Sequence, residues 1–456
     1  MNRISFRGVS GWLLALGSVA LGSLSNALAA IPIQHWVQPS GAAIYLVQSP
    51  ALPMVDVQID FDAGARRDPP GQAGLASAMA GMISKGLRAA GSSGGSGRYD
   101  AALDENMLGE AWADLGASFG ASAGSDRMSF SLRSLNYPDL LERALQLAGR
   151  QMADPAFPPQ VWQRERERLA AAIREANTRP ATVAARNFEA AVYGSHPYGY
   201  DTTEASLKRI EVSDMKDLHR RSLLPCRAKL SVVGAVSREQ ADSLATQLLA
   251  RLPSGPCAEL PKVPEVSPLA AASEKNIPFD SAQAHVLIGQ PGFARVDPDF
   301  FALLVGNYTL GGGGFVSRLT TEVREKRGLS YSVYSYFAPG LHAGAWTLGL
   351  QTRPDQAAQA VQVARETVRR FVAEGPSDAE LKAAKDNLIG GFALRIDSNR
   401  KLLDNVANIA WNNLPLNYLD TWSQQIASIT VADIRAAFAR KLQPERMVTV
   451  VVGAKP

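Results

Sequence analysis

Arg324 and Tyr331 are the residues whose types and spacing most directly suggest chemistry. Arg324 falls in the last turn of a predicted helix, and Tyr331 falls near the start of a predicted strand. Gly328 between them is typical of a helix C-cap, so one tight turn would bring both side chains toward one point. A guanidinium and a phenol placed together can donate hydrogen bonds to a peptide carbonyl or to its oxyanion. The pair therefore predicts a site that binds polar backbone groups.

Each of these features also has a simpler structural explanation. An arginine near a helix C-terminus usually interacts with the helix dipole, and a tyrosine in a strand usually packs. A phosphate-binding loop would need Lys-Ser or Lys-Thr after its last glycine, and Phe315-Val316 stands there, so we exclude that function. The glycine run itself more often forms a turn than a ligand cradle; its members are Gly311, Gly312, Gly313 and Gly314.

The elements that would position the pair are predicted from the spacing of apolar residues. Phe315, Leu319 and Val323 are spaced to form the inner face of the helix that carries Arg324. The strand after Gly328 should alternate between two faces, with one set at Leu329, Tyr331 and Val333, and the other at Ser330, Ser332, Tyr334 and Tyr336.

The chain of 456 residues is long enough for two domains, and it contains an internal repeat. The stretch from Ile210, "IEVSDMKDLHRRSLLPCRAKLSVVGA", aligns without gaps on the stretch from Ile429, "ITVADIRAAFARKLQPERMVTVVVGA". Each copy reads as a helix, a Pro-containing turn and a final apolar strand. Residues 253–279 between the copies are rich in proline and read as an extended connector.

The fold class predicted from these patterns is α+β. Residues 55–61 alternate between apolar and polar types, as a strand with one wet face does, and "AHVLIGQPG" opens the second half in a similar way. Strands interleaved with long helices favour a mainly antiparallel sheet covered by helices on one face. We therefore expect two homologous domains, at residues 30–252 and 280–456.

Residues 1–29 are predicted to be a cleaved signal peptide. Arg3 and Arg7 precede an apolar run at residues 12–24, and Ala27-Leu28-Ala29 matches the small-x-small cleavage pattern. Because the run is shorter than the roughly 20 residues that span a bilayer, an uncleaved anchor is the less favoured alternative. We expect a periplasmic protein without stable membrane insertion.

The charge pattern and the two cysteines bear on the partners and on the compartment of the protein. Lys and Arg are interleaved with Asp and Glu, and the net charge is +4, so we expect no nucleic-acid partner. The two cysteines, Cys226 and Cys257, could form a disulfide in an exported protein, but their spacing alone leaves this open.

The duplication, together with "GGGGFVSRLTTEVREKRGLSYSVYS", resembles the M16 family of zinc metallopeptidases, which includes pitrilysin, insulin-degrading enzyme and the mitochondrial processing peptidases. The resemblance covers essentially the whole chain after the signal peptide. In that family an arginine and a tyrosine at this spacing, on the domain without metal, bind substrate near the scissile bond. The resemblance implies this role for Arg324 and Tyr331, and it leaves open whether the glycine run contacts substrate.

The same resemblance implies that the zinc site has been lost. The family carries an inverted motif, His-x-x-Glu-His, on the first helix of its other domain. This chain keeps the surrounding Gly74-Leu75-Ala76, Met82 and Lys85-Gly86. Zinc needs imidazole, thiolate or carboxylate ligands. The matching positions hold none of these; they are Ser77, Ala80 and Gly81, with Ala172 at the place of the third ligand.

These observations predict a protein that does not hydrolyse peptides alone. The leading hypothesis is a non-catalytic, substrate-binding subunit of a periplasmic heterodimeric zinc peptidase, with no cofactor in this chain and zinc in a partner that carries His-x-x-Glu-His. The alternative is a peptide-binding pseudo-peptidase or a scaffold that takes no part in hydrolysis. An autonomous hydrolase of another kind is disfavoured because we find no constellation of a nucleophile with its activating residues in the sequence.

Overall fold

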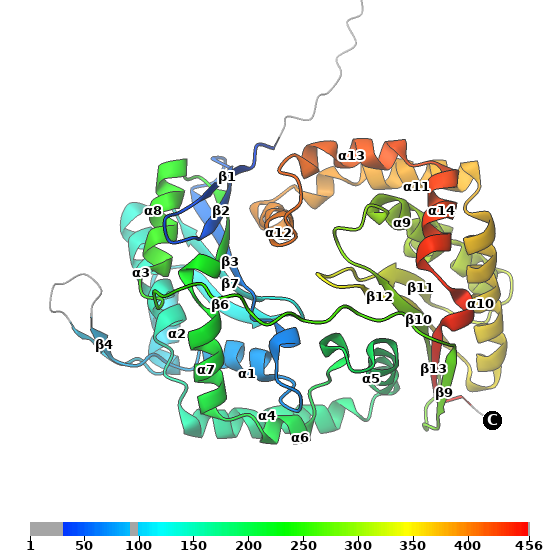
Figure 1. Cartoon of the computed structure of the whole chain (residues 1–456), viewed down its shortest axis with the longest axis horizontal. Coiled ribbons are helices and arrows are strands. Elements are labelled where there is room, and N and C mark those ends of the chain that lie inside the picture. The colour runs from blue at the N-terminus through cyan, green and yellow to red at the C-terminus, as the bar shows by residue number, and fades with distance from the viewer. Residues whose placement is uncertain (1–30, 92–98, 455–456) are drawn as a thin grey trace, which may run out of the picture.

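The computed structural model describes residues 31–91 and 99–454, which form two halves, each built on one sheet (Figure 1). The predicted signal peptide, residues 1–29, lies outside the described residues. In Figure 1 the first half lies on the left and the second half on the right, joined by a long connecting segment.

The first half contains a six-stranded sheet with strand order β1-β2-β8-β3-β7-β6. Only the β2–β8 pair is parallel, and the other pairs are antiparallel. The strands, in spatial order, are β1 (Gln34–Val37), β2 (Ala43–Gln48), β8 (Lys229–Gly234), β3 (Met54–Phe61), β7 (Met128–Leu135) and β6 (Ser118–Ala123).

The second half contains a five-stranded sheet with strand order β11-β12-β10-β13-β9. Here the β13–β9 pair is the parallel one. The strands are β11 (Val333–Phe337), β12 (Gly344–Thr352), β10 (Ala284–Phe293), β13 (Val448–Val452) and β9 (Ser273–Ile277). Reading both sheets from the parallel pair, β2-β8-β3-β7-β6 matches β9-β13-β10-β12-β11, as expected for a duplicated domain.

The structure confirms the predicted fold class and adjusts one boundary. Both sheets are mainly antiparallel, and each half packs its own helices against one face of its sheet. Strand β9, however, lies within residues 253–279, which the proline content had suggested to be connector throughout. The segment SEKNI contains no proline and pairs with β13, so the extended connector ends before Ser273.

The remaining helices of each half pack with its sheet around a core of bulky apolar side chains. Those of the first half are α1 (Leu75–Met82), α2 (Glu105–Asp114), α3 (Pro138–Ala153), α4 (Pro159–Ala176), α6 (Glu204–Lys208), α7 (Val212–Ser222) and α8 (Arg238–Leu249). Those of the second half are α9 (Phe300–Asn307), α10 (Ala357–Glu374), α11 (Asp378–Gly390), α13 (Tyr418–Ser428) and α14 (Val431–Lys441).

Two further helices cross between the halves and cover the remaining faces of the sheets. Helix α5 (Pro180–Tyr193) packs on β10 and β13, and its Phe188 ring rests where Gly289 leaves space: a Cβ at Gly289 would come within 2.7 Å of it. Helix α12 (Asn399–Trp411) packs in turn on β8, β3 and β2. Each sheet is therefore completed by a helix from the other half.

Cationic side chains of the first sheet hold the C-terminal end of α12. The Lys229 ammonium donates to the Ala410 carbonyl at 2.8 Å and to the Asn413 side-chain oxygen at 2.7 Å. Arg127 donates to the Ala407 carbonyl at 3.2 Å and pairs with the fully buried Asp60 carboxylate at 2.8 Å. Positive charge at a helix C-terminus is favourable because the last carbonyls lack intrahelical partners.

Cys226 and Cys257 form a disulfide, with their Cα atoms 6.3 Å apart. The bond settles the question that the sequence left open. It ties the start of the connector to the turn that precedes β8. Across the described ranges, no helix combines the length and apolar character needed to cross a bilayer.

We expect removal of the disulfide to lower the free energy of unfolding by about 2 to 4 kcal/mol, because it closes a loop of 31 residues and restricts the unfolded chain. The test is denaturant unfolding of the double variant Cys226→Ala, Cys257→Ala. Wild-type protein in reductant should lose the same amount. Equal stability in the oxidised and reduced states would contradict the prediction.

The Lys229→Met variant, which keeps most of the side-chain stem, should lose about 1.5 to 3 kcal/mol of unfolding free energy, because it leaves carbonyls at the end of α12 without a charged donor. The matched control is Lys208→Met, at an exposed position on α6. If both variants unfold at the same denaturant concentration as the wild type, this docking of α12 is not a source of stability.

Candidate functional site

The structure brings Arg324 and Tyr331 together and adds a third residue, Phe315. The Arg324 guanidinium carbon lies 4.4 Å from the Tyr331 ring centroid and 4.7 Å from the Phe315 ring centroid. Both distances fall within the range of cation–π attraction. The stack of Phe315, Arg324 and Tyr331 is the candidate site, and its role in substrate binding stays a prediction.

The backbone between the two predicted residues makes this convergence possible. Arg324 lies on a π-helical turn, η6 (Thr320–Glu325), a form of helix that is often found at functional sites. Gly328 follows with φ of 62°, where a side chain would be strained, and its amide donates to the Arg324 carbonyl at 2.8 Å. The C-cap itself is Lys326, so Gly328 is not the cap that the sequence suggested; it turns the chain two residues later.

The alternation of side chains predicted that Tyr331 would share a strand face with Leu329 and Val333, and this prediction is wrong. Strand β11 begins at Val333, and Tyr331 lies in the bend before it with 80% of its surface exposed. Leu329 is buried, and its amide donates to the Val323 carbonyl at 3.0 Å. This hydrogen bond holds the chain against η6. The phenol is therefore presented to solvent rather than packed.

Phe315 was predicted to lie on the inner face of a helix with Leu319 and Val323. The latter two are fully buried, but Phe315 is 68% exposed and lies in the short turn η5 (Gly314–Val316), before η6 begins. Ser317, between Phe315 and Leu319, has an extended backbone, so Phe315 lies in a separate turn, and apolar spacing alone cannot show where the next helix starts. Sequence reasoning therefore missed that Phe315 contacts Arg324.

The charges around the stack leave the Arg324 guanidinium available. Glu322 accepts hydrogen bonds from Lys326 and Arg327, which together lower the pKa of its carboxyl to about 2. Arg370 approaches the same carboxylate at 3.3 Å. In the part of the chain that the structure describes, no acidic side chain forms a salt bridge with Arg324.

The glycine run is explained mainly by close packing and a turn. A Cβ at Gly311 would come within 2.6 Å of the Ser335 amide nitrogen, and one at Gly313 within 2.8 Å of the Tyr308 carbonyl. Gly314 has φ of 61° and open space around it. Gly312 and Gly314 are exposed and Gly311 is buried, so at most part of the run could reach a ligand.

Asn307 joins the glycine run to the sheet, and the sequence analysis did not single it out. Its side chain donates to the Ser335 carbonyl at 2.9 Å and accepts from the Ser335 hydroxyl at 2.8 Å and from the Trp346 indole at 3.1 Å. The only hint in the sequence was that Asn307, a polar residue, ends the apolar run FFALLVGN. This bonding fixes α9 and the π-helical turn η4 (Tyr308–Gly312) against β11 and β12.

The helix that matches the zinc helix of the family is α1. Ser77 and Gly81 lie on its exposed side, and Ala80 lies on its buried side. A Cβ at Gly81 would meet nothing within 4 Å. Ala172 lies exposed on α4. None of these four positions offers a lone pair that zinc favours, so the residues present do not fit a zinc ion.

The histidines do not replace the missing ligands, because four of the five have other contacts. His219 bonds to the Met152 carbonyl, His35 to the Ile44 carbonyl and His196 to the Pro264 carbonyl. His342 lies 3.1 Å from the Glu265 carboxylate on the connector. Within residues 31–91 and 99–454, no three His, Cys, Asp or Glu side chains are grouped as a metal site requires.

Both halves of the chain match one protein family. Residues 43–206 match the family described as Insulinase (Peptidase family M16), and residues 209–388 match the one described as Peptidase M16 inactive domain. A crystal structure of a peptidase M16 inactive domain from Pseudomonas fluorescens is 31% identical, has a TM-score of 0.84, and covers 93% of this chain and 98% of its own.

Two curated relatives give a mixed picture. A protein named non-peptidase homolog, from Helicobacter pylori, is 24% identical over 84% of this chain and 85% of its own length. A protein of Streptomyces coelicolor named uncharacterized zinc protease is 34% identical, but only over 40% of each chain. The alignments with this protein and with two mycobacterial ones span 40%, 60% and 63% of those relatives.

The likeness to the Pseudomonas structure extends over nearly the full length of both chains, at 31% identity. The duplicated sheet order and the degenerate metal positions on α1 agree with it. This chain belongs to the M16 family of peptidases.

Proposed function

We propose that this chain is the non-catalytic, substrate-binding subunit of a heterodimeric M16 zinc peptidase. The observation that carries the proposal is the stack of Phe315, Arg324 and Tyr331, in which the Tyr331 ring is exposed and Arg324 has no salt bridge among the described residues. The positions on α1 and α4 that match the family's zinc ligands hold no side chain that zinc favours. A chain with the first feature and without zinc ligands needs a partner to complete a site.

The chemistry of this chain would be to hold the peptide bond while a partner cleaves it. The Tyr331 hydroxyl and the Arg324 guanidinium can donate to the carbonyl oxygen and to the adjoining backbone, and their donation strengthens as negative charge develops. Phe315 limits the directions in which the guanidinium can point. A partner M16 subunit with His-x-x-Glu-His would bring the zinc and the water that attacks.

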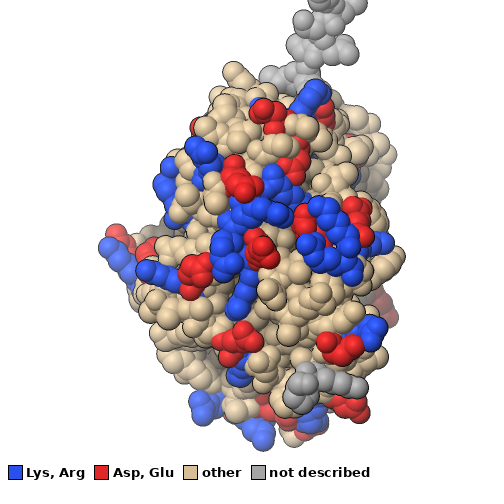
Figure 2. Space-filling model, turned by 90° about the vertical axis from the view of Figure 1, so that its right-hand side faces the viewer, with Lys and Arg blue, Asp and Glu red and all other residues tan. Residues whose placement is uncertain are grey.

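The proposed compartment is the periplasm. The signal-peptide pattern of residues 1–29 supports export, and the disulfide between Cys226 and Cys257 fits an oxidising compartment. Charges of both signs are intermingled on the face of the second half that Figure 2 presents, with pairs such as Arg369 with Glu445. This surface does not favour a nucleic acid as the partner.

A second candidate is a peptide-binding pseudo-peptidase or scaffold without any part in hydrolysis. The Helicobacter relative, whose name says that it is not a peptidase, favours this alternative. The two proposals differ in what Arg324 and Tyr331 do, because a scaffold needs no donors toward a scissile carbonyl. A reading frame next to this one that encodes a similar-length protein with His-x-x-Glu-His would favour the heterodimer.

The Tyr331→Phe variant tests the proposed role. In the reconstituted pair, kcat should fall about a hundred- to a thousandfold, the usual effect of losing one donor toward an oxyanion, while the protein folds normally. The measurement is cleavage of an unfolded peptide by equal amounts of each pair. Tyr137→Phe, at another exposed tyrosine, is the control and should keep full activity. Undiminished turnover by Tyr331→Phe would rule out the assigned role.

The Phe315→Leu variant tests whether the second ring positions the guanidinium. Because an exposed cation–π contact contributes about 0.5 to 1 kcal/mol, kcat/KM of the pair should fall about two- to fivefold, and Phe315→Tyr should retain it. Val316→Ala, at the neighbouring exposed position, should change little. Equal losses in the Phe315→Leu and Val316→Ala variants would show that only the apolar character of the turn matters.

A further inference from the structure

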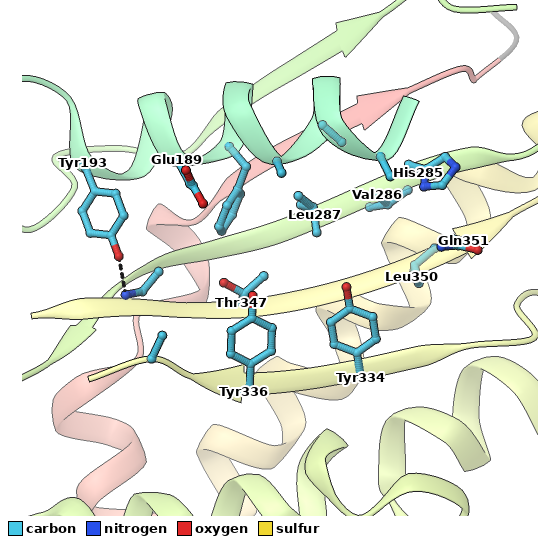
Figure 3. Close-up of a pocket in the computed structure, with 16 residues that line it drawn as sticks. Glu189, Tyr193, His285, Val286, Leu287, Tyr334, Tyr336, Thr347, Leu350 and Gln351 are labelled. Atoms are coloured by element: carbon cyan, nitrogen blue, oxygen red, sulfur yellow. Dashed lines mark hydrogen bonds between the residues drawn. The ribbon is translucent and has the colours of Figure 1, made fainter. Parts of the chain in front are cut away.

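A groove lies between helix α5, from the first half, and the face of the second sheet that α5 only partly covers (Figure 3). Its volume is about 230 Å³. Pockets for drug-sized ligands have about 300 to 1,000 Å³, so this one suits a single side chain. The sequence analysis gave no role to the residues that line it.

Two tyrosines of β11 form one wall of the groove. The rings of Tyr334 and Tyr336 lie 6.1 Å apart with an interplanar angle of 18°, and in Figure 3 their hydroxyl ends point from β11 toward α5. Gly349 on β12 makes room for the first ring, since a Cβ there would come within 2.5 Å of it. Both tyrosines remain more than two-fifths exposed, at 43% and 47%. Stacked, accessible ring faces attract cations.

Glu189 of α5 brings negative charge to the opposite wall. Its surroundings raise the pKa of its carboxyl, chiefly by desolvation and also through the nearby Asp201 charge. Among the described residues no Lys or Arg forms a salt bridge with Glu189, and none lines the groove. Burial raises the pKa of Tyr193 beside it to about 12, and burial lowers that of His285. Both therefore stay uncharged near neutral pH.

We propose that this groove binds the side chain of a lysine or arginine in a bound peptide. The apolar stem would lie along Tyr334 and Tyr336, and the cationic end would reach Glu189. Electroneutrality favours this occupant, because the groove has a carboxylate and no cation of its own. The proposal names the substrate class of the proposed peptide-binding function and rests on it, but it concerns binding by this chain alone.

The position of the groove relates it to the stack at Arg324. Tyr334 follows Tyr331 by three residues, a span of about 10 Å in extended chain. A peptide cannot pair with β11 at Ser335, because Asn307 occupies the Ser335 carbonyl and Gly311 lies against its amide. The peptide would therefore reach the groove across the inner face of the sheet, and its basic residue would lie a few positions from the bond held at Tyr331.

The test is the affinity of the isolated full chain for matched, blocked pentapeptides, Ala-Ala-Lys-Ala-Ala and the same peptide with norleucine, followed by NMR titration. Wild-type protein should bind the lysine peptide at least about tenfold more tightly, corresponding to one charge-assisted contact. High salt should reduce this preference. Glu189→Gln should abolish it, whereas Glu167→Gln, at an exposed position on α4, should keep it.

Equal affinity of the wild type for the two peptides, or an unchanged lysine preference in Glu189→Gln, would overturn the proposal. Cadaverine, a free diamine of similar length, should bind much more weakly than the peptide, and equal binding would show that the groove serves free cations instead. Circular dichroism checks that each variant is folded. The binding test needs no partner subunit. If this chain prefers the lysine peptide but no reconstituted pair cleaves peptides, the heterodimer proposal is wrong and the proposal for the groove still holds.

Discussion

Each sheet of this protein has one face that only a helix from the other half covers. Helix α5 lies on β10 and β13, and α12 lies on β8, β3 and β2. Burial of these faces removes apolar side chains such as Val47 and Val450 from water, which stabilises the packing of the two halves against each other. The same exchange places Glu189 and Tyr193 of α5 on the groove that Tyr334 and Tyr336 of β11 also line.

On α1 the residues that pack are separate from the positions that match the family's zinc ligands, so those positions can vary without loss of the fold. The residues that hold the helix, such as Leu75, Met79 and Met82, point into the core. Two of the three lost ligand positions on the helix, Ser77 and Gly81, face solvent, and replacing them leaves no cavity. The packing of α1 therefore does not depend on which residues occupy these positions.

Sequence patterns predicted the duplication, the mainly antiparallel sheets and the convergence of Arg324 with Tyr331, because these depend on apolar periodicity and on one glycine turn. They did not predict the exposed position of Phe315, because extended Ser317 separates it from the helix, nor that Tyr331 lies outside the strand, because β11 begins only at Val333. The exchange of α5 and α12, and hence the environment of Glu189, also could not be predicted, since it depends on contacts between residues far apart in sequence.

The central claim is that this chain binds peptide and that another chain holds the metal. The most direct measurement is the zinc content of each polypeptide after purification of the native protein and separation of whatever co-elutes with it. The account predicts less than stoichiometric, background zinc in this chain and one zinc per molecule in a co-eluting M16 subunit with His-x-x-Glu-His. One tightly bound zinc in this chain alone, with peptide cleavage by the isolated chain, would contradict it.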